Sequence, residues 1–287
     1  MERQGIFMKI GTCIRGQHLL EDLKNAVAAG FDTVELYFNE TLAGTDFKEI
    51  ASSIKRITGY HGITVSGVGL YCNPLQSEEA RKELEYCIEN VHLLGTDFVG
   101  TFAGAIPGKS VEEAIPAFKK VFTKLTELAE YNGTRIGIEN AHMYGNWYSA
   151  TCNIGFCPRA WEIMFNEVQS RCLGLEWEPS HQAEQLIDPL KQLEEWMPKI
   201  FHVHGKDAHV DYRHIKKYGA WFGESYCVHR FPGMGDTDWE QIINILEHGG
   251  YEGDITVEGY HDPVYCGGKE ADGQRMALAY LRECCGY

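Results

Sequence analysis

The chain has 287 residues, 44% hydrophobic and 23% charged, which is long enough for one barrel-sized domain or two smaller ones. Its 26 basic and 41 acidic residues give a net charge of −15. Such an acidic surface repels phosphate backbones and makes nucleic acid an unfavourable partner. No apolar run approaches the roughly 18 residues of a membrane span, so we expect no membrane partner.

The cysteines and the start of the chain bear on where the protein works. None of the 10 cysteines forms a CxxC pair, and a chain this rich in core residues needs no disulfide scaffold. We therefore predict free thiols in a reducing, cytoplasmic setting. The opening residues lack the long apolar core of a signal peptide, and residues 1–7 are predicted to be a loose tail.

Short apolar segments alternate with longer amphipathic ones along the chain. Helical patterns include residues 18–30, 110–133 and 236–250, and the second begins with Ser110 three residues before Glu113, a capping box. We predict eight strands, over residues 7–13, 33–38, 64–70, 98–104, 135–140, 172–178, 200–207 and 254–260.

Strands that alternate with helices predict parallel pairing and an α/β fold. Eight units of about 36 residues match a (β/α)₈ TIM barrel, which we predict as a single domain over residues 1–287. A doubly wound open sheet is the alternative, but the turn GTCIRGQH after the first strand lacks its GxGxxG pattern. Two long connections, from 140 to about 157 and from 207 to about 236, would lie on the top face of a barrel, where chemistry takes place.

Ionisable residues stand at the ends of the last four predicted strands. Glu139 ends the fifth, Glu178 the sixth, His204 lies near the end of the seventh, and Glu258 ends the eighth. Three carboxylates and an imidazole from adjacent strands would form an oxygen and nitrogen cage for Mn²⁺, Mg²⁺, Co²⁺ or Zn²⁺. A solvated rim carboxylate is the alternative for any one of them taken alone.

Other polar residues lie close to this predicted site. Glu176 and His202 would face inward one layer deeper, in supporting roles. His181, just past the sixth strand, would touch a substrate or cap a loop, and His142 on the fifth loop is a candidate general base. Arg230 would bind a substrate oxygen or pair with a surface acid. Lys206 and Asp207 are expected to form a local ion pair.

Six motifs carry a resemblance to a known family over nearly the whole chain: VGTFAG (99–104), IEN (138–140), GLEWEPSH (174–181), FHVHGKD (201–207), FPGMGDTDW (231–239) and GGYEGDITVEGYHDP (249–263). The chain resembles the xylose isomerase-like TIM-barrel superfamily, in particular its sugar phosphate isomerase/epimerase branch. The resemblance implies one divalent metal, most often Mn²⁺, held by Glu139, Glu178, His204 and Glu258. The family usually has Asp where this chain has Glu178, so the metal would sit differently or be bound bidentately.

The resemblance further implies a metal-dependent isomerase or epimerase that acts on a sugar or keto-sugar through an enediolate. Glu139 and Glu258 would serve as acid and base, while His181 and Arg230 would bind substrate. A lyase on a keto-sugar or 3-keto-glycoside, with His142 as a natural base, is the alternative. Some relatives of this lyase type work with a small partner subunit, whereas a homo-oligomer is the other expected assembly.

Two further alternatives make predictions of their own. An apurinic-site endonuclease would need a three-zinc cluster with extra histidine ligands, and the third and fourth predicted strands end in GLY and TFAG without one. A barrel that only binds a sugar should have lost metal-competent groups, which this chain keeps at all four strand ends.

Overall fold

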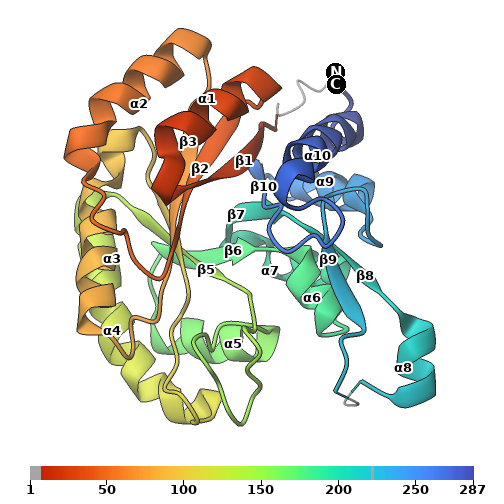
Figure 1. The fold of residues 1–287 in the computed structure, drawn as a ribbon. Helices are drawn as coiled ribbons and strands as arrows, with labels where there is room; N and C mark the ends of the chain where they lie inside the picture. Colours follow the sequence, from red (N-terminus) through yellow and green to blue (C-terminus); the bar gives the residue numbers. More distant parts are fainter. Residues whose placement is uncertain (1–7, 221–222) are drawn as a thin grey trace.

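Eight parallel strands close into a barrel in this computed structural model, which describes residues 8–220 and 223–287 (Figure 1). Around the ring the order is β1-β10-β7-β6-β5-β4-β3-β2, and every neighbouring pair is parallel. The predicted TIM barrel is therefore confirmed. The strands are β1 (Ile10–Arg15), β2 (Thr33–Asn39), β3 (Thr64–Tyr71), β4 (Phe98–Thr101), β5 (Arg135–Glu139), β6 (Leu173–Trp177), β7 (Ile200–Gly205) and β10 (Ile255–Val257).

Helices follow most barrel strands and pack on the outside of the ring. The predicted capping box is present in α4, where Ser110 Oγ accepts from the backbone of Glu113 and the Glu113 side chain accepts from the backbone of Ser110. Gly133 ends the same helix in a left-handed conformation, which glycine adopts without strain. The α-helices around the barrel are α1 (Leu19–Ala29), α2 (Phe47–His61), α3 (Glu78–Asn90), α4 (Val111–Asn132), α5 (Pro158–Glu167), α6 (Pro179–Glu184), α7 (Pro189–Trp196), α9 (Trp239–His248) and α10 (Glu270–Cys284).

The connection after β7 contains secondary structure that the sequence did not predict. β8 (Asp207–Val210) and β9 (Cys227–Arg230) pair as an antiparallel ribbon, and the short helix α8 (Tyr212–Tyr218) lies between them. Figure 1 shows this ribbon extending away from the barrel beside α6, against which β8 packs. Single 3₁₀ turns occupy Gly16–His18, Val91–Leu94, Met197–Lys199 and Gly267–Lys269.

The predicted ion pair between Lys206 and Asp207 is wrong. Asp207 instead accepts hydrogen bonds from the backbone N–H groups of Gly233, Gly235 and Thr237, and so holds the PGMG turn against β8. Lys206 points to the other side and donates to Glu258. Successive side chains of an extended segment point in opposite directions, so adjacent residues do not meet.

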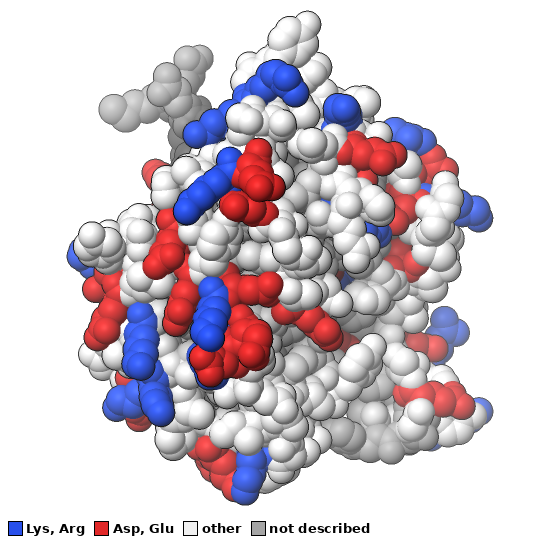
Figure 2. Space-filling model, turned by 60° about the vertical axis from the view of Figure 1, so that its left-hand side comes forward, with Lys and Arg blue, Asp and Glu red and all other residues white. Residues whose placement is uncertain are grey.

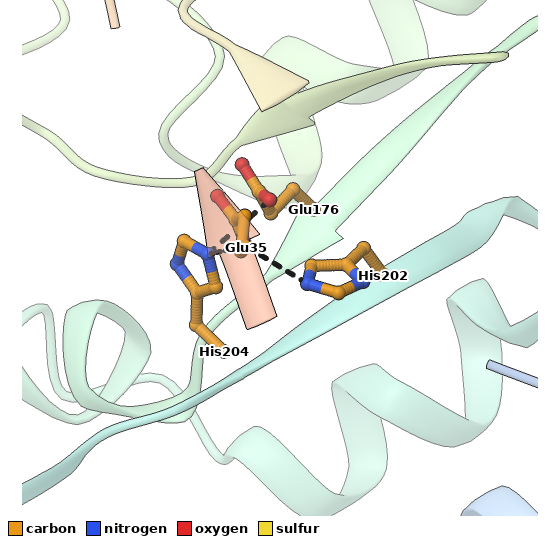
Figure 3. Close-up of side chains that lie close together, drawn as sticks. All are labelled: Glu35, Glu176, His202 and His204. Atoms are coloured by element: carbon orange, nitrogen blue, oxygen red, sulfur yellow. Dashed lines mark hydrogen bonds and ion pairs between the residues drawn. The ribbon is translucent and has the colours of Figure 1, made fainter. Parts of the chain in front are cut away.

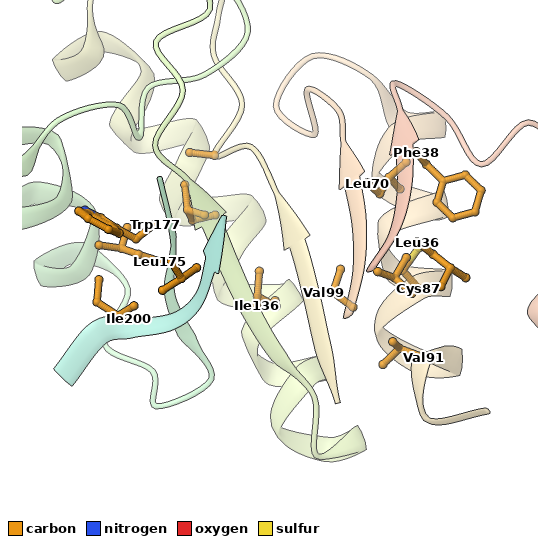
Figure 4. Close-up of a cluster of buried hydrophobic side chains, with 14 of the residues drawn as sticks. Leu36, Phe38, Leu70, Cys87, Val91, Val99, Ile136, Leu175, Trp177 and Ile200 are labelled. Carbon is orange, nitrogen blue, oxygen red and sulfur yellow. The ribbon is translucent and has the colours of Figure 1, made fainter. Parts of the chain in front are cut away.

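An apolar layer fills the space between the strands and the outer helices (Figure 4). Val99, Ile136, Leu175 and Trp177 are completely buried there. Burying one such side chain contributes about 1.5–3 kcal/mol relative to leaving it in water, so this layer is the main source of stability. The inside of the barrel differs, because ionisable side chains replace the usual aliphatic ones near the C-terminal ends of the strands.

The outer surface carries charges of both signs. On the face turned forward in Figure 2, basic side chains lie singly or in small groups among acidic ones. None of the helices in the described residues is long and apolar enough to cross a membrane. All 10 cysteines are free, as the sequence predicted. The predicted tail over 1–7 falls outside the described residues, and the single-domain organisation stays a prediction.

Candidate metal centre

The four predicted ligands converge at the C-terminal end of the barrel. Glu139 is the last residue of β5, Glu178 follows β6, His204 lies near the end of β7, and Glu258 follows β10. These strands are consecutive in the ring, so their ends meet at one edge. All four side chains are buried, and each offers one ligand atom within 4.8 Å of the others.

Two of the three distances from His204 Nδ1 fit ligand atoms around one cation, and the third is slightly longer. His204 Nδ1 lies 3.3 Å from Glu139 Oε1, 3.3 Å from Glu258 Oε2 and 3.7 Å from Glu178 Oε2. Ligand atoms roughly 2.0–2.2 Å from one ion are separated by about 3–3.6 Å. His204 Nδ1, Glu178 Oε2 and Glu258 Oε2 are buried without a hydrogen-bond partner in the described part of the chain. Buried polar atoms are normally paired, and a divalent cation would satisfy all of them.

Glu35, on β2, forms a lower layer of the site together with His202, on the Nε2 side of the His204 imidazole, and fixes the orientation of this ring (Figure 3). Its Oε2 is 3.0 Å from His204 Nε2 and 2.9 Å from His202 Nε2, while its Oε1 accepts from the Tyr71 hydroxyl at 2.8 Å. A proton on His204 Nε2 that is donated to Glu35 leaves the Nδ1 lone pair facing the centre. Carboxylates hold metal-binding histidines in this way.

Glu176 completes this lower layer, where the sequence had placed it together with His202. Its Oε1 is 3.2 Å from His204 Nε2, and its Oε2 is 2.9 Å from the Tyr71 hydroxyl. Two glycines make room for the buried acids, because a Cβ at Gly69 would collide with Glu35 and one at Gly100 with Glu176. The sequence did not predict that Glu35 belongs to the site. Its position could have suggested this, because Glu35 is a carboxylate within the apolar strand segment TVELYF.

The three carboxylates on the Nδ1 side of His204 differ in how readily they ionise. They belong to Glu139, Glu178 and Glu258 and form the upper layer of the site. Burial, with the neighbouring charge of Glu258, raises the pKa of Glu139 to about 7. Burial alone would also raise the pKa of Glu178 and of Glu258. The positive charge of Lys206 contributes to lowering both pKa values, and His181 contributes to lowering the pKa of Glu178 as well. Without a cation the group is crowded with like charge, and a divalent ion would stabilise the ionised form of all three.

Lys206 contributes a positive charge that sequence reasoning did not assign to the site. Its side chain is 2% exposed, and Nζ donates to Glu258 Oε1 at 2.9 Å and lies 3.7 Å from Glu178 Oε1. Burial alone would lower the pKa of Lys206, but these two glutamates raise it above its ordinary value. An ammonium therefore stays charged inside the wall of the centre.

A group of histidines lies at the mouth of the centre. His181 Nε2 is 3.2 Å from Glu178 Oε1, which places this ring next to a predicted ligand. Glu184 Oε2 lies 3.4 Å from His142 Nδ1, 3.8 Å from His181 Nδ1 and 3.4 Å from His229 Nε2. The structure thus brings His142 and His181 together, and it adds Glu184 and His229, which the sequence did not single out.

Arg230 lies on β9, at the edge of the same region. Its Nε donates to Oδ2 of buried Asp262 at 3.0 Å, and the backbone N–H of Phe231 donates to the same oxygen. The partner of Arg230 is thus a buried carboxylate, where the sequence had suggested a surface acid as one of two options. Whether its remaining N–H groups bind substrate stays a proposal.

One cavity lies elsewhere, at the N-terminal end of the barrel. It has a volume of about 510 Å³ and includes Lys9, Thr64, Arg135 and Asp254 in its lining. Two of its charged groups already have partners, since Lys9 donates to Thr64 and Arg135 to Asp97. TIM-barrel chemistry takes place at the opposite, C-terminal face, where the unpaired buried groups converge. We therefore assign the site to the C-terminal face.

Comparison with known families agrees with this fold. The family model described as xylose isomerase-like TIM barrel matches residues 23–284. The chain belongs to this family. The resemblance inferred from the six motifs is thereby confirmed, and solved structures similar to this one include sugar epimerases. It is a family of enzymes, and buried acidic and histidine groups able to hold a metal are present here.

Relatives within the family carry out different reactions. Over 277 residues the chain is 26% identical to a 3-dehydroshikimate dehydratase from Pseudomonas aeruginosa, covering 92% of this chain and 40% of that protein. Over 80 residues it is 35% identical to an inosose dehydratase from Clostridium tetani, covering 27% of each. The chain thus spans less than half the length of either relative. The crystal structure of the 3-keto-D-glucoside 4-epimerase from E. coli superimposes with a TM-score of 0.70 at 18% identity, covering 96% of this chain and 100% of that one, which shows a shared fold.

Proposed function

We propose that this protein is a divalent-metal-dependent isomerase or epimerase of a sugar or keto-sugar that works through an enediolate. The observation that carries the proposal is the convergence of Glu139, Glu178, His204 and Glu258, with buried ligand atoms left unpaired. Mn²⁺ suits a set of three carboxylates and one imidazole best, while Mg²⁺, Co²⁺ and Zn²⁺ are the other candidates. When bound, such an ion supplies Lewis-acid stabilisation of negative charge on the substrate's carbonyl oxygen.

Glu139 and Glu258 are the proposed proton-transfer groups. They lie at the ends of β5 and β10, which have β6 and β7 between them in the ring, and each lies 3.3 Å from His204 Nδ1. A planar enediolate between them would present one face to each carboxylate. One glutamate removes the proton on the carbon next to the carbonyl, and the other returns it to the opposite face. Return by the same glutamate to the neighbouring carbon would give isomerisation.

His181 and Arg230 are the proposed substrate contacts. The His181 ring lies beside Glu178 at the mouth of the centre, within reach of an oxygen held there. Asp262 fixes the Nε edge of Arg230, which leaves the outer edge of the guanidinium for a hydroxyl group. These contacts would orient the substrate so that the reacting carbon faces a glutamate.

A lyase that acts through the same enolate is the second candidate. Two observations favour it: the dehydratase names of the curated relatives, and the position of His142 close to His181. If the group β to the carbonyl leaves after proton removal, the outcome is elimination. His142 would then serve as an additional base, and a 3-keto-glycoside or an inosose would be the substrate type.

The test is solvent deuterium wash-in with a panel of keto-sugars and 3-keto-glycosides in the presence of Mn²⁺. Incorporation at one carbon together with an isomer or epimer would support the proposal. An unsaturated or cleaved product without an epimer would support the lyase instead. If Mn²⁺-loaded protein exchanged no hydrogen in any keto-sugar of the panel, the enediolate proposal would be contradicted.

A further inference from the structure

Lys206 is an unusual residue to find inside a cation site. It follows β7 directly, two residues after His204, and its side chain is among the largest that are fully buried in the described residues. The ammonium lies beside Glu258 and Glu178, two of the carboxylates that would hold the metal. Burying both members of an ion pair costs the hydration of two charges, so a role that needs the charge is expected at this position.

The hydrogen bonds of Lys206 leave donors unused. An ammonium has three N–H groups, and in the described residues only Glu258 Oε1 accepts one of them, at 2.9 Å. The 3.7 Å between Nζ and Glu178 Oε1 exceeds the length of a hydrogen bond. Lys199, near the other end of the barrel, contrasts with this, because its half-buried ammonium donates to the carbonyl oxygens of Ser170 and Leu173. Two N–H groups of Lys206 thus remain for a ligand.

Glu258 links the ammonium to the metal position. Its Oε1 accepts from Lys206, and its Oε2 faces the centre 3.3 Å from His204 Nδ1. The two oxygens of one carboxylate are close neighbours, so a substrate oxygen bound beside the metal position would come within reach of Nζ. That oxygen becomes negatively charged in an enediolate, and a fixed cation beside developing charge lowers the barrier.

We propose that Lys206 is a catalytic residue that donates a hydrogen bond to the substrate oxygen on which the enediolate charge develops. This inference rests on the proposed function. Lys206 keeps its proton throughout: the proton that leaves carbon goes to a glutamate, and no bond to Nζ forms or breaks.

Removing the ammonium should change metal affinity and the rate of proton exchange in opposite directions. The ammonium repels a divalent cation in the same site, so its removal should strengthen metal binding. The same removal should slow proton exchange, because the enediolate loses a stabilising charge. A purely structural lysine would behave differently, since its loss would disturb the carboxylates and weaken both.

The experiment compares Lys206→Met with the wild type and with Lys199→Met as a matched control. Mn²⁺ affinity is measured by titration calorimetry without substrate, and deuterium wash-in is measured with the substrate that the panel identifies. For Lys206→Met we expect Mn²⁺ to bind about tenfold more tightly or better, while exchange at saturating Mn²⁺ falls about 10²- to 10³-fold. Lys199→Met should change neither. If Lys206→Met does not fold, Lys206→Gln keeps a donor without the charge and should bind Mn²⁺ more tightly in the same way.

Two results would overturn the proposal. One is exchange by the folded Lys206 variant at the wild-type rate, and the other is slower exchange accompanied by weaker Mn²⁺ binding. A wild type that exchanges no substrate of the panel would overturn the proposed function. In that case the proposed contact between Lys206 and substrate is overturned as well. The Mn²⁺ affinities of the wild type and of Lys206→Met still show whether the ammonium weakens metal binding.

Discussion

Replacing Glu35 by Gln should weaken metal binding at a site that Glu35 itself does not enter. In the wild type, Glu35 Oε2 lies 3.0 Å from His204 Nε2 and 2.9 Å from His202 Nε2. The amide of Gln has a single acceptor oxygen, whereas the carboxylate takes donors from both imidazoles and from Tyr71. At least one donor loses its partner, and His204 is free to turn its protonated nitrogen toward the centre.

The magnitude follows from the bond that is lost. A hydrogen bond to a charged group contributes about 1.5–3 kcal/mol, which corresponds to roughly a 10- to 100-fold change in affinity. We therefore expect Glu35→Gln to bind Mn²⁺ 10- to 100-fold more weakly, still with one ion per chain. Glu270→Gln removes a similar charge from a partly exposed pair with Arg15 and should leave the affinity unchanged. If folded Glu35→Gln bound Mn²⁺ within threefold of the wild type, the orienting role of Glu35 would be refuted.

Three further predictions follow from the same geometry. Glu258→Gln should slow deuterium exchange by about 10³-fold with an unchanged circular dichroism spectrum, and a fully active variant would disprove its assignment as a proton-transfer group. Mn²⁺ affinity should fall as the pH drops below 7, because the pKa of Glu139 is raised to about 7 and a proton competes with the ion; calorimetry at pH 6, 7 and 8 should show this, and a flat profile would contradict it. Phe122→Ala should cost about 3–5 kcal/mol of unfolding free energy in urea, because Phe122 is fully buried, and a loss below 1 kcal/mol would show that the core repacks.

The barrel strands could be predicted because their apolar segments are short, regularly spaced and separated by helical patterns. Their ends could be predicted to within a few residues for the same reason. The β8 and β9 ribbon could not, since DAHV and CVHR are four-residue segments within a polar stretch. β8 and β9 are separated by 16 residues, and their pairing depends on contacts with α6 that the local sequence does not encode.

The upper layer of the site was also readable from the sequence. Parallel strands bring their C-terminal ends to one edge, so Glu139, Glu178, His204 and Glu258 could be expected to meet. The lower layer was harder, because the depth at which Glu35 meets His204 depends on the tilt and stagger of strands far apart in the chain. Lys206 was misjudged because its neighbour in sequence, Asp207, is not its neighbour in space.

The most direct test of the account is a crystal grown with millimolar Mn²⁺ and measured for anomalous scattering at the manganese edge. We predict one strong peak about 2.0–2.3 Å from one atom each of Glu139, Glu178, His204 and Glu258, with His204 bound through Nδ1. A well-ordered crystal without a peak there would contradict the account. So would a peak found only at the mouth, among His142, His181 and Glu184.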